Sequence, residues 1–351
     1  SDQAIYSEDA IHHPVWAKNG MVATQEALAS DIGLQILKDG GNAVDAGVAV
    51  GFALAVTLPR AGNIGGGGFM MIYDAKQGKT VALDYREKAP SSASRDMYLD
   101  KEGNAVSDLS RYHGLAVGVP GTVAGLLKAL EEHGTMSRRQ VMAPAIALAE
   151  DGIEVTAGLS ESLTALSDRL QKWPSTKKVF FKPDGSAYQP GERLKQPELA
   201  RSLKRIAVQG TDGFYKGETA QKLVKAVKEA GGSMSLEDLA NYQAIAREPV
   251  KGDYRRYESV SMPPPSSGGS HIVQIWNILE GYPLRDYGQN SAQTIHLMAE
   301  AMQLAYADRA EYLGDADFID VPASGLTSQA YADKLRTLID PNKATPAATI
   351  K

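Results

Sequence analysis

The residues most suggestive of chemistry are four consecutive glycines, Gly65–Gly68, and Arg86, which follows a short apolar stretch after them. A glycine run costs conformational entropy and is uncommon unless the chain turns sharply or other atoms approach its backbone. Arg86 could offer a fixed fork of donors to a carboxylate. Together they suggest a backbone close to a site that receives an anion. The spacing by itself favours a simpler interpretation, in which the glycines form a tight hairpin and Arg86 pairs internally with Asp84 or Glu87.

The glycine run does not fit a nucleotide-binding loop. A phosphate-binding loop continues into Lys and Ser or Thr, whereas Phe69 and two methionines follow here. A dinucleotide fingerprint follows a strand and opens a helix, while this run follows a predicted helix and opens a predicted strand. The sequence therefore disfavours nucleotide binding.

No complete catalytic set is visible. A nucleophile elbow needs Gly-x-Ser-x-Gly, which no segment provides. Ser266, Ser267, Ser270 and His271 are close in sequence, but a proline-rich turn that leads into a helix explains them at least as well as a nucleophile and base.

Metal ligands and paired carboxylates are not indicated either. His12 and His13 are adjacent, and the other histidines have no partner at ligand spacing: His113, His133, His271 and His296. An acidic group accompanies Arg309 on or near one predicted helix, and it indicates solvated faces and ion pairs rather than a carboxylate dyad: Glu300, Asp308, Glu311 and Asp315. We expect no metal site and no cofactor.

The elements that would position Arg86 are two short strands. Residues 69–73 and 80–84 are apolar and β-favouring, and the polar segment 74–79 joins them, so the pattern predicts a β-hairpin. Arg86 then lies just past the end of the second strand. Rigid scaffolds often hold functional residues at such places.

Helical patterns surround this hairpin. Residues 25–39 predict an amphipathic helix that ends at Gly40, and residues 43–57 predict a helix buried on all sides, because the stretch is too short and too interrupted by Asp45 to span a membrane. Further helices are expected at 123–133, 138–150, 159–171, 220–229, 271–280 and 292–312. Three other segments have different patterns. Residues 173–197 are expected to be irregular, residues 235–238 to form a capping box that opens a short helix, and residues 254–262 to form a strand.

Composition predicts a globular chain. The sequence has 351 residues, is 43% hydrophobic and carries a formal charge of −5, with scattered rather than clustered cations, so nucleic acid is not an expected partner. The absence of cysteine excludes disulfides, thiolate metal sites and a cysteine nucleophile. The start at Ser1–Gln3 lacks the basic and apolar stretches of a signal peptide, although one could have been cleaved, and the tail 340–351 is expected to be exposed. Without a repeat or a central linker, residues 1–351 are expected to form a single domain.

The chain resembles the γ-glutamyltranspeptidase family along almost its whole length. The resemblance rests on many segments that occur in the same order along the chain rather than on one motif. These segments include Gly20–Ala23, Gly40–Ala46, Ala61–Phe69, Asp84–Pro90, Gly118–Thr122, Asp253–Arg255, Met262–Gly269 and Tyr306–Arg309. The family consists of N-terminal nucleophile hydrolases, each made as a precursor that cuts itself into a large and a small subunit.

This resemblance implies an α+β fold, the four-layer αββα sandwich, shared with a small subunit that is not in this chain. Residues 1–351 would be the large subunit of an obligate heterodimer, and the end near Lys351 resembles the segment before the cleavage point. The nucleophile would be the N-terminal threonine of the small subunit, so no catalytic residue is expected in this chain.

The implied chemistry is acyl transfer from a γ-glutamyl amide, such as glutathione, to water or to an amino acid or peptide acceptor. Arg86 matches the family arginine that holds the substrate α-carboxylate, and Glu87 could orient Arg86 or the substrate amino group, or be structural. The glycines become a closely packed entry to the central sheet. Bacterial members are typically periplasmic or secreted. A related glutaryl or cephalosporin acylase, or a non-catalytic binding protein of the same fold, remains an alternative.

Overall fold

A computed structural model describes residues 14–350, whereas Ser1–Gln3, His12, His13 and Lys351 lie outside the described residues. The chain divides into two compact units, each described by itself. Unit 1 comprises the described part of Ser1–Gly66 together with Glu87–Tyr242. Unit 2 comprises Gly67–Arg86 and the described part of Gln243–Lys351.

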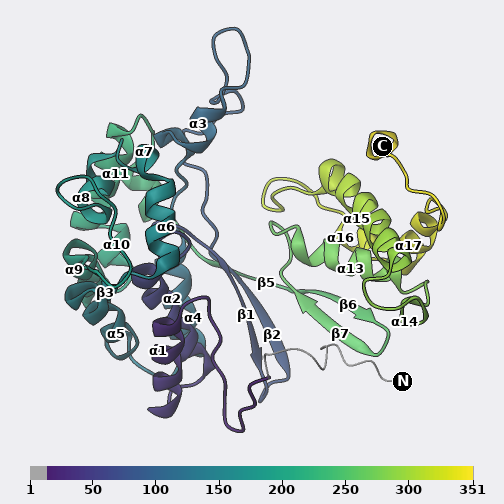
Figure 1. The fold of residues 1–351 in the computed structure, drawn as a ribbon, viewed down its shortest axis with the longest axis horizontal. Helices are drawn as coiled ribbons and strands as arrows, with labels where there is room; N and C mark the ends of the chain where they lie inside the picture. The colour runs from purple at the N-terminus through teal and green to yellow at the C-terminus, as the bar shows by residue number, and fades with distance from the viewer. Residues whose placement is uncertain (1–13, 351) are drawn as a thin grey trace. The chain divides into compact units, whose positions relative to one another are not determined.

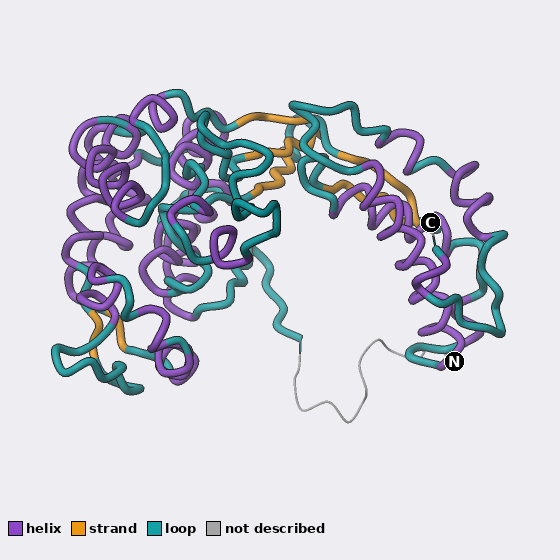
Figure 2. Tube along the Cα trace, turned by 90° about the horizontal axis from the view of Figure 1, so that it is seen from above, coloured by secondary structure: helices purple, strands orange, loops and turns teal. Residues whose placement is uncertain are grey.

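Unit 1 is mainly helical, and helix predominates over strand in the tube of Figure 2. Its helices are α1 (Ala27–Lys38), α2 (Ala43–Thr57), α3 (Ser107–Arg111), α4 (Thr122–His133), α5 (Arg138–Asp151), α6 (Ala157–Ala165), α7 (Ser167–Leu170), α8 (Pro174–Phe180), α9 (Pro197–Gln209), α10 (Asp212–Tyr215), α11 (Gly217–Glu229) and α12 (Leu236–Ala240). A short 3₁₀ turn, Gly114–Ala116, and two paired two-residue strands, β3 (Ile153–Glu154) and β4 (Arg193–Leu194), complete it.

Helix α2 forms the centre of unit 1 and packs against α1, α4 and α5. Val48, Phe52 and Val56 on it are fully buried, which confirms the predicted helix 43–57 and its burial. Burial of an apolar helix on all sides is what its composition requires, since no polar face is available for solvent.

A buried carboxylate begins α2. Asp45 completes a capping box with Asn42 and also accepts hydrogen bonds from the Thr135 hydroxyl (2.6 Å) and from the N–H groups of Thr135 (2.8 Å) and Met136 (2.9 Å). Burial raises the pKa of Asp45, but the hydrogen bonds from Thr135, Met136 and Asn42 outweigh burial and hold this pKa below its ordinary value. One charged group therefore ties the start of α2 to the α4–α5 turn.

Unit 2 combines two small sheets with helices. Strands β1 (Phe69–Asp74), β2 (Lys79–Asp84) and β5 (Ile245–Arg247) form an antiparallel sheet in the order β1-β2-β5, with Phe69 opposite Asp84 and Ala82 opposite Arg247. Strands β6 (Val250–Tyr254) and β7 (Tyr257–Ser261) form a hairpin. The helices are α13 (Gly268–Leu279), α14 (Leu284–Tyr287), α15 (Ala292–Tyr312), α16 (Ala323–Leu326) and α17 (Gln329–Arg336), and a 3₁₀ turn spans Ala347–Thr349.

Helix α13 is the centre of unit 2. It packs against α15 and α17 and against the β6–β7 hairpin, and its labelled neighbours can be followed in Figure 1. The apolar core includes Ile278 and Leu279 from α13, Leu297 and Ala301 from α15, and Leu335 from α17.

Three predictions of local structure are wrong. The segment 254–262 is not one strand, because the chain reverses at Arg255, whose φ of 56° is left-handed, and Tyr254 pairs with Tyr257. The segment 159–171 is interrupted at Leu166, between α6 and α7. The segment 173–197 is not wholly irregular, since Pro174 starts α8, a first-turn position where proline costs no hydrogen bond.

The predicted α+β class is confirmed by this mixture of helices and antiparallel sheet. The predicted tail is mostly exposed, although the Thr345 N–H donates to Glu300 Oε1 at 2.8 Å. Among residues 14–350, no helix has both the length and the apolar character needed to cross a membrane.

Candidate functional site

Arg86 lies just beyond β2, as the sequence predicts. Gly68 and Tyr85 extend the β1–β2 ladder by one pair, with N–H to carbonyl distances of 3.2 and 3.0 Å. Arg86 is exposed, and its guanidinium carbon lies 5.9 Å from the centre of the Phe69 ring, within the range of a cation–π contact. The antiparallel ladder therefore fixes the backbone from which Arg86 projects.

A buried charge network supports that backbone. Asp84 Oδ1 accepts from the Arg86 backbone N–H at 3.0 Å, and Asp84 Oδ2 accepts from Arg247 Nε at 2.9 Å. Arg247 also donates to both carboxylate oxygens of Asp317, at 3.0 and 2.9 Å. The side chains of Asp84 and Arg247 are only 6% and 14% exposed, so these bonds are little screened by water.

The network gives Asp84 a different ion-pair partner from the one that its sequence spacing suggests. Asp84 forms its ion pair with Arg247, and its bond to Arg86 is to the backbone rather than to the guanidinium. Hydrogen bonds from Arg247 to Asp317 raise the pKa of Arg247, burial opposes this, and Asp84 adds to the rise, so Arg247 stays charged. Sequence analysis missed Arg247 and Asp317, because no local motif marks an arginine that β5 pairing brings to Asp84 or a distant aspartate that binds this arginine.

Glu87 belongs to unit 1 and lies beside two glycines. A Cβ added at Gly118 would lie 2.8 Å from the Glu87 Cβ, and one added at Gly66 would lie 3.3 Å from Glu87 Oε1. The Gly66 carbonyl accepts from the N–H groups of Gly121 and Thr122 at 2.7 and 3.0 Å, at the start of α4. Close packing around the backbone thus explains why position 66 is a glycine. This agrees with the interpretation of the glycine run as a closely packed entry to the sheet.

The Ser/His group of α13 does not form a nucleophile and base. Ser270 Oγ and His271 Nε2 are buried, and neither has a hydrogen-bond partner in the described part of the chain. Ser267 Oγ instead accepts from Arg309 Nε at 3.3 Å. Burial and Arg309 lower the pKa of His271 while Asp308 opposes them. The structural interpretation of these residues is therefore confirmed.

Two of the acidic residues on α15 are buried, so the expectation of solvated faces is wrong for them. Glu300 and Asp308 are 3% and 9% exposed. Asp308 accepts from the Tyr331 hydroxyl at 2.9 Å and from Gln274 Nε2. Burial and the bond to Asp308 raise the pKa of Tyr331 to about 12, so Tyr331 remains a donor. Within residues 14–350, no three His, Asp or Glu side chains gather as a metal site would require.

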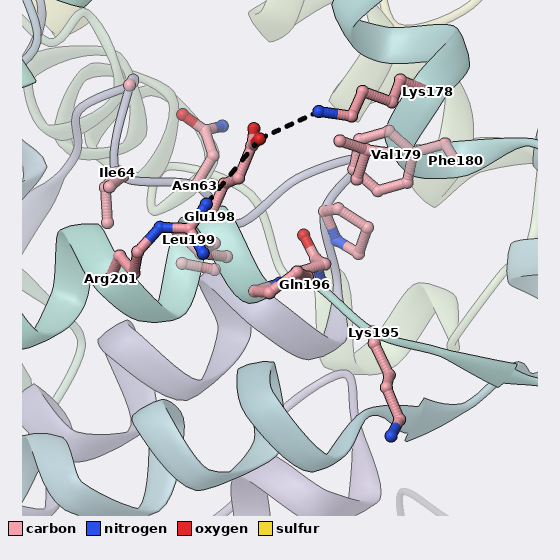
Figure 3. A pocket seen from close by; sticks show the side chains of 14 residues that line it. Asn63, Ile64, Lys178, Val179, Phe180, Lys195, Gln196, Glu198, Leu199 and Arg201 are labelled. Atoms are coloured by element: carbon pink, nitrogen blue, oxygen red, sulfur yellow. Dashed lines mark hydrogen bonds and ion pairs between the residues drawn. The ribbon is translucent and has the colours of Figure 1, made fainter.

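A cavity of about 480 Å³ opens in unit 1 beside the start of the glycine run (Figure 3). Ile64, Val179, Phe180 and Leu199 give it an apolar lining, and Glu198 at its rim pairs with Lys178 at 3.0 Å. Its lining residues include neither Arg86 nor Glu87. The cavity therefore shares Gly65 with the glycine run but neither of the two residues that the sequence predicts to bind substrate.

Comparisons with known proteins place the chain in a family. The family model described as gamma-glutamyltranspeptidase matches residues 29–351. The chain is 51% identical over 345 residues to the glutathione hydrolase proenzyme of Escherichia coli strain K12, covering 98% of this chain and 59% of that relative. It is 42% identical to the acylase ACY 1 proenzyme of Pseudomonas sp. strain SE83, covering 94% of this chain and 60% of that protein.

A solved structure agrees in fold. The crystal structure of Helicobacter pylori gamma-glutamyltranspeptidase superposes with a TM-score of 0.94 at 47% identity, and the match covers 96% of this chain and 97% of that chain. The chain therefore spans under two thirds of the curated relatives named above but nearly all of the chain in this crystal structure. With the family model matched from residue 29 onward and the fold shared, the chain belongs to the γ-glutamyltranspeptidase family.

Proposed function

We propose that this chain is the large subunit of a γ-glutamyltransferase and glutathione hydrolase that cleaves the γ-glutamyl amide bond of glutathione and related compounds. The observation that carries the proposal is the family match from residue 29 to 351, at 51% identity to a glutathione hydrolase proenzyme. The exposed Arg86 on a fixed strand end is consistent with it, because a carboxylate can be reached there by both guanidinium donors.

In the proposed mechanism, Arg86 binds the α-carboxylate of the γ-glutamyl group. The hydroxyl of an N-terminal threonine, on a second subunit, attacks the γ-carbonyl while a base takes its proton. The C–N bond breaks, the amine leaves with a proton, and a γ-glutamyl ester remains. Water or an acceptor amine then attacks the ester and restores the hydroxyl. Glu87, adjacent to Arg86 in the chain, would face the substrate amino group or fix Arg86.

The proposal includes a two-chain enzyme. The curated relatives named above are described as proenzymes. The match to the Helicobacter pylori structure covers nearly all of both chains. Both facts support processing of a precursor into this subunit and a smaller one. We further propose that the two subunits together build a four-layer αββα sandwich as one domain, and that the enzyme is exported to the periplasm or secreted, as bacterial members of the family typically are.

Replacement of Arg86 in the complete enzyme tests the proposal. Arg86→Ala removes the charge and both fork hydrogen bonds, so transition-state binding of γ-glutamyl-p-nitroanilide should weaken by roughly 2 to 5 kcal/mol. Arg86→Lys keeps the charge without the fork, so its transition-state binding should lie between that of the parent enzyme and that of Arg86→Ala. Steady-state kinetics measure both variants. An Arg86→Ala enzyme with the parent kcat/KM would remove Arg86 from the substrate site.

The acylase alternative is favoured by the 42% identity to acylase ACY 1. Such an enzyme would act on a glutaryl group, which lacks the α-amino and α-carboxylate groups of γ-glutamyl. Turnover of glutaryl-p-nitroanilide and γ-glutamyl-p-nitroanilide by one preparation separates the two functions. A clear preference for the glutaryl compound would replace our proposal, and turnover of neither would favour a non-catalytic binding protein of the same fold.

A further inference from the structure

The cavity in unit 1 has the size and the lining of a small-molecule site. Its volume of about 480 Å³ lies within the range of ligand pockets, which is roughly 300 to 1,000 Å³. Three segments that are far apart in the sequence enclose it, namely the end of α2 with the loop after it, the end of α8, and the start of α9. Ile64, Val179, Phe180 and Leu199 give this space an apolar surface, so it suits an apolar group.

One buried polar side chain reaches the cavity. Gln196 is 5% exposed, and its Nε2 donates to the Val56 carbonyl at 3.0 Å, so the orientation of the amide is fixed. Its Oε1 accepts no hydrogen bond from the described residues, and it faces the space that the lining side chains enclose (Figure 3). A nearly buried acceptor without a protein donor can accept a hydrogen bond from a bound group. Gln196 therefore favours a ligand that carries an N–H or O–H donor.

The start of α9 offers donors at the same cavity. The first N–H groups of a helix have no acceptor within the helix, and the Gln196 side chain does not cap those of α9. Glu198 and Leu199 belong to this first turn, and both line the cavity. Lys178 and Arg201 lie 3.0 and 3.8 Å from Glu198 at the rim, so two cations and one carboxylate meet there. The positive end of the helix and the excess of cations favour a bound carboxylate.

We propose that this cavity binds a free α-amino acid with an apolar side chain. Its carboxylate would lie at the start of α9, its ammonium group would donate to Gln196 Oε1, and its side chain would occupy the space beside Val179 and Phe180. An amine lacks the anion that the helix start favours, and a plain carboxylate lacks a donor for Gln196. The inference goes beyond the proposed function, because the lining includes neither substrate-site residue and binding requires no turnover.

Isothermal titration calorimetry of the complete enzyme tests the class of ligand. Three probes share a phenyl ring: L-phenylalanine has both polar groups, 3-phenylpropionate lacks the ammonium group, and 2-phenylethylamine lacks the carboxylate. We expect L-phenylalanine to bind with a Kd below about 1 mM, and each truncated probe to bind at least about tenfold more weakly, because it leaves one polar partner in the cavity unused. Absence of L-phenylalanine binding, or equal affinity for either truncated probe, would overturn the inference.

Substitution then locates the bound amino acid. Val179→Trp places a larger side chain in the cavity and should raise the Kd for L-phenylalanine at least about tenfold. Ile64→Trp, which fills the cavity from the loop after α2, should have the same effect and serves as the test if Val179→Trp does not fold. Val208→Trp on α9 is the matched control, since Val208 is 58% exposed and does not line the cavity. Thermal unfolding shows which variants are folded.

Arg86→Ala separates this cavity from the proposed substrate site. We expect Arg86→Ala to keep the parent Kd for L-phenylalanine, because Arg86 does not line the cavity. A Kd that rises in Arg86→Ala but stays at the parent value in folded Val179→Trp or Ile64→Trp would assign the binding to the substrate site and refute our inference. The proposed function fails separately, by absence of γ-glutamyl turnover in an enzyme that still binds L-phenylalanine in this cavity.

Discussion

At the scale of single residues, the Arg86 site depends on atoms that never meet the substrate in our proposal. Asp84 holds the Arg86 backbone with one oxygen and Arg247 with the other, and Asp317 fixes the guanidinium of Arg247. A carboxylate clamp must be held within a fraction of an ångström to favour one substrate geometry. We therefore propose that Arg247 and Asp317 act as positioning residues for Arg86.

Replacement of Arg247 by lysine should test this role. Arg247→Lys keeps the positive charge beside Asp84 but loses the two-point bond to Asp317. We expect KM for γ-glutamyl-p-nitroanilide to rise about 3- to 30-fold with little change in kcat, since ground-state and transition-state binding of the carboxylate weaken equally. Arg256→Lys, an exposed arginine of the β6–β7 turn, is the control. A fall in kcat with constant KM would contradict a positioning role.

Asp45 offers a second test at this scale, of stability and its pH dependence. Because hydrogen bonds hold the folded-state pKa of Asp45 below its ordinary value, ionised Asp45 stabilises the fold above the unfolded-state pKa, and this contribution is lost as the pH falls through the folded-state pKa. Asp45→Asn should lower the free energy of unfolding by about 1 to 3 kcal/mol at pH 7, and by less in acid. Urea unfolding at both pH values measures the difference. Asp31→Asn, exposed on α1, should change little at either pH, and a deficit for Asp45→Asn that grew in acid would refute the assignment.

At the scale of elements, the two hairpins show what sequence can and cannot predict. The first was predictable almost to the residue, because apolar strands 69–74 and 79–84 flank a polar loop. The second was not, because its reversal uses Arg255 at a left-handed φ of 56° where glycine or asparagine would give a signal. The position of Arg86 followed from local pattern alone, whereas its support by Arg247 and Asp317 depends on tertiary contacts that no spacing encodes.

Substitution can distinguish the roles of individual glycines in the run. A Cβ at Gly68 would lie 2.9 Å from Cε2 of the buried Tyr85 ring, whereas a Cβ at Gly65 would meet only Asn63 Oδ1 at 3.6 Å. Gly68→Ala should therefore displace the strand end that carries Arg86, lower stability by about 1 to 3 kcal/mol and raise KM. Gly65→Ala should stay within about 0.5 kcal/mol of the parent. Thermal unfolding and kinetics of the two variants compare them, and equal effects would mean that general flexibility, not the Tyr85 contact, requires the glycines.

At the scale of the whole molecule, the proposed mechanism assigns substrate binding to this chain and nucleophilic attack to a second subunit. It offers an arginine on a fixed strand end, whereas Ser270 and His271 make no hydrogen bond to each other. The chain spans 59% of the E. coli proenzyme and covers 97% of the chain in the Helicobacter pylori structure. In our proposal the nucleophile belongs to the second subunit.

Intact-mass and N-terminal analysis of the purified enzyme tests this division of labour. We expect two polypeptides that stay together through gel filtration, and we expect the smaller one to begin with threonine, because an N-terminal threonine carries both the attacking hydroxyl and a free α-amine that can act as its base. Replacement of that threonine by alanine in the precursor should leave a single uncut chain without turnover. A fully active enzyme composed of one uncut chain would contradict the mechanism, while a partner that begins with another nucleophile, such as serine, would keep the two-chain architecture and change the attacking atom.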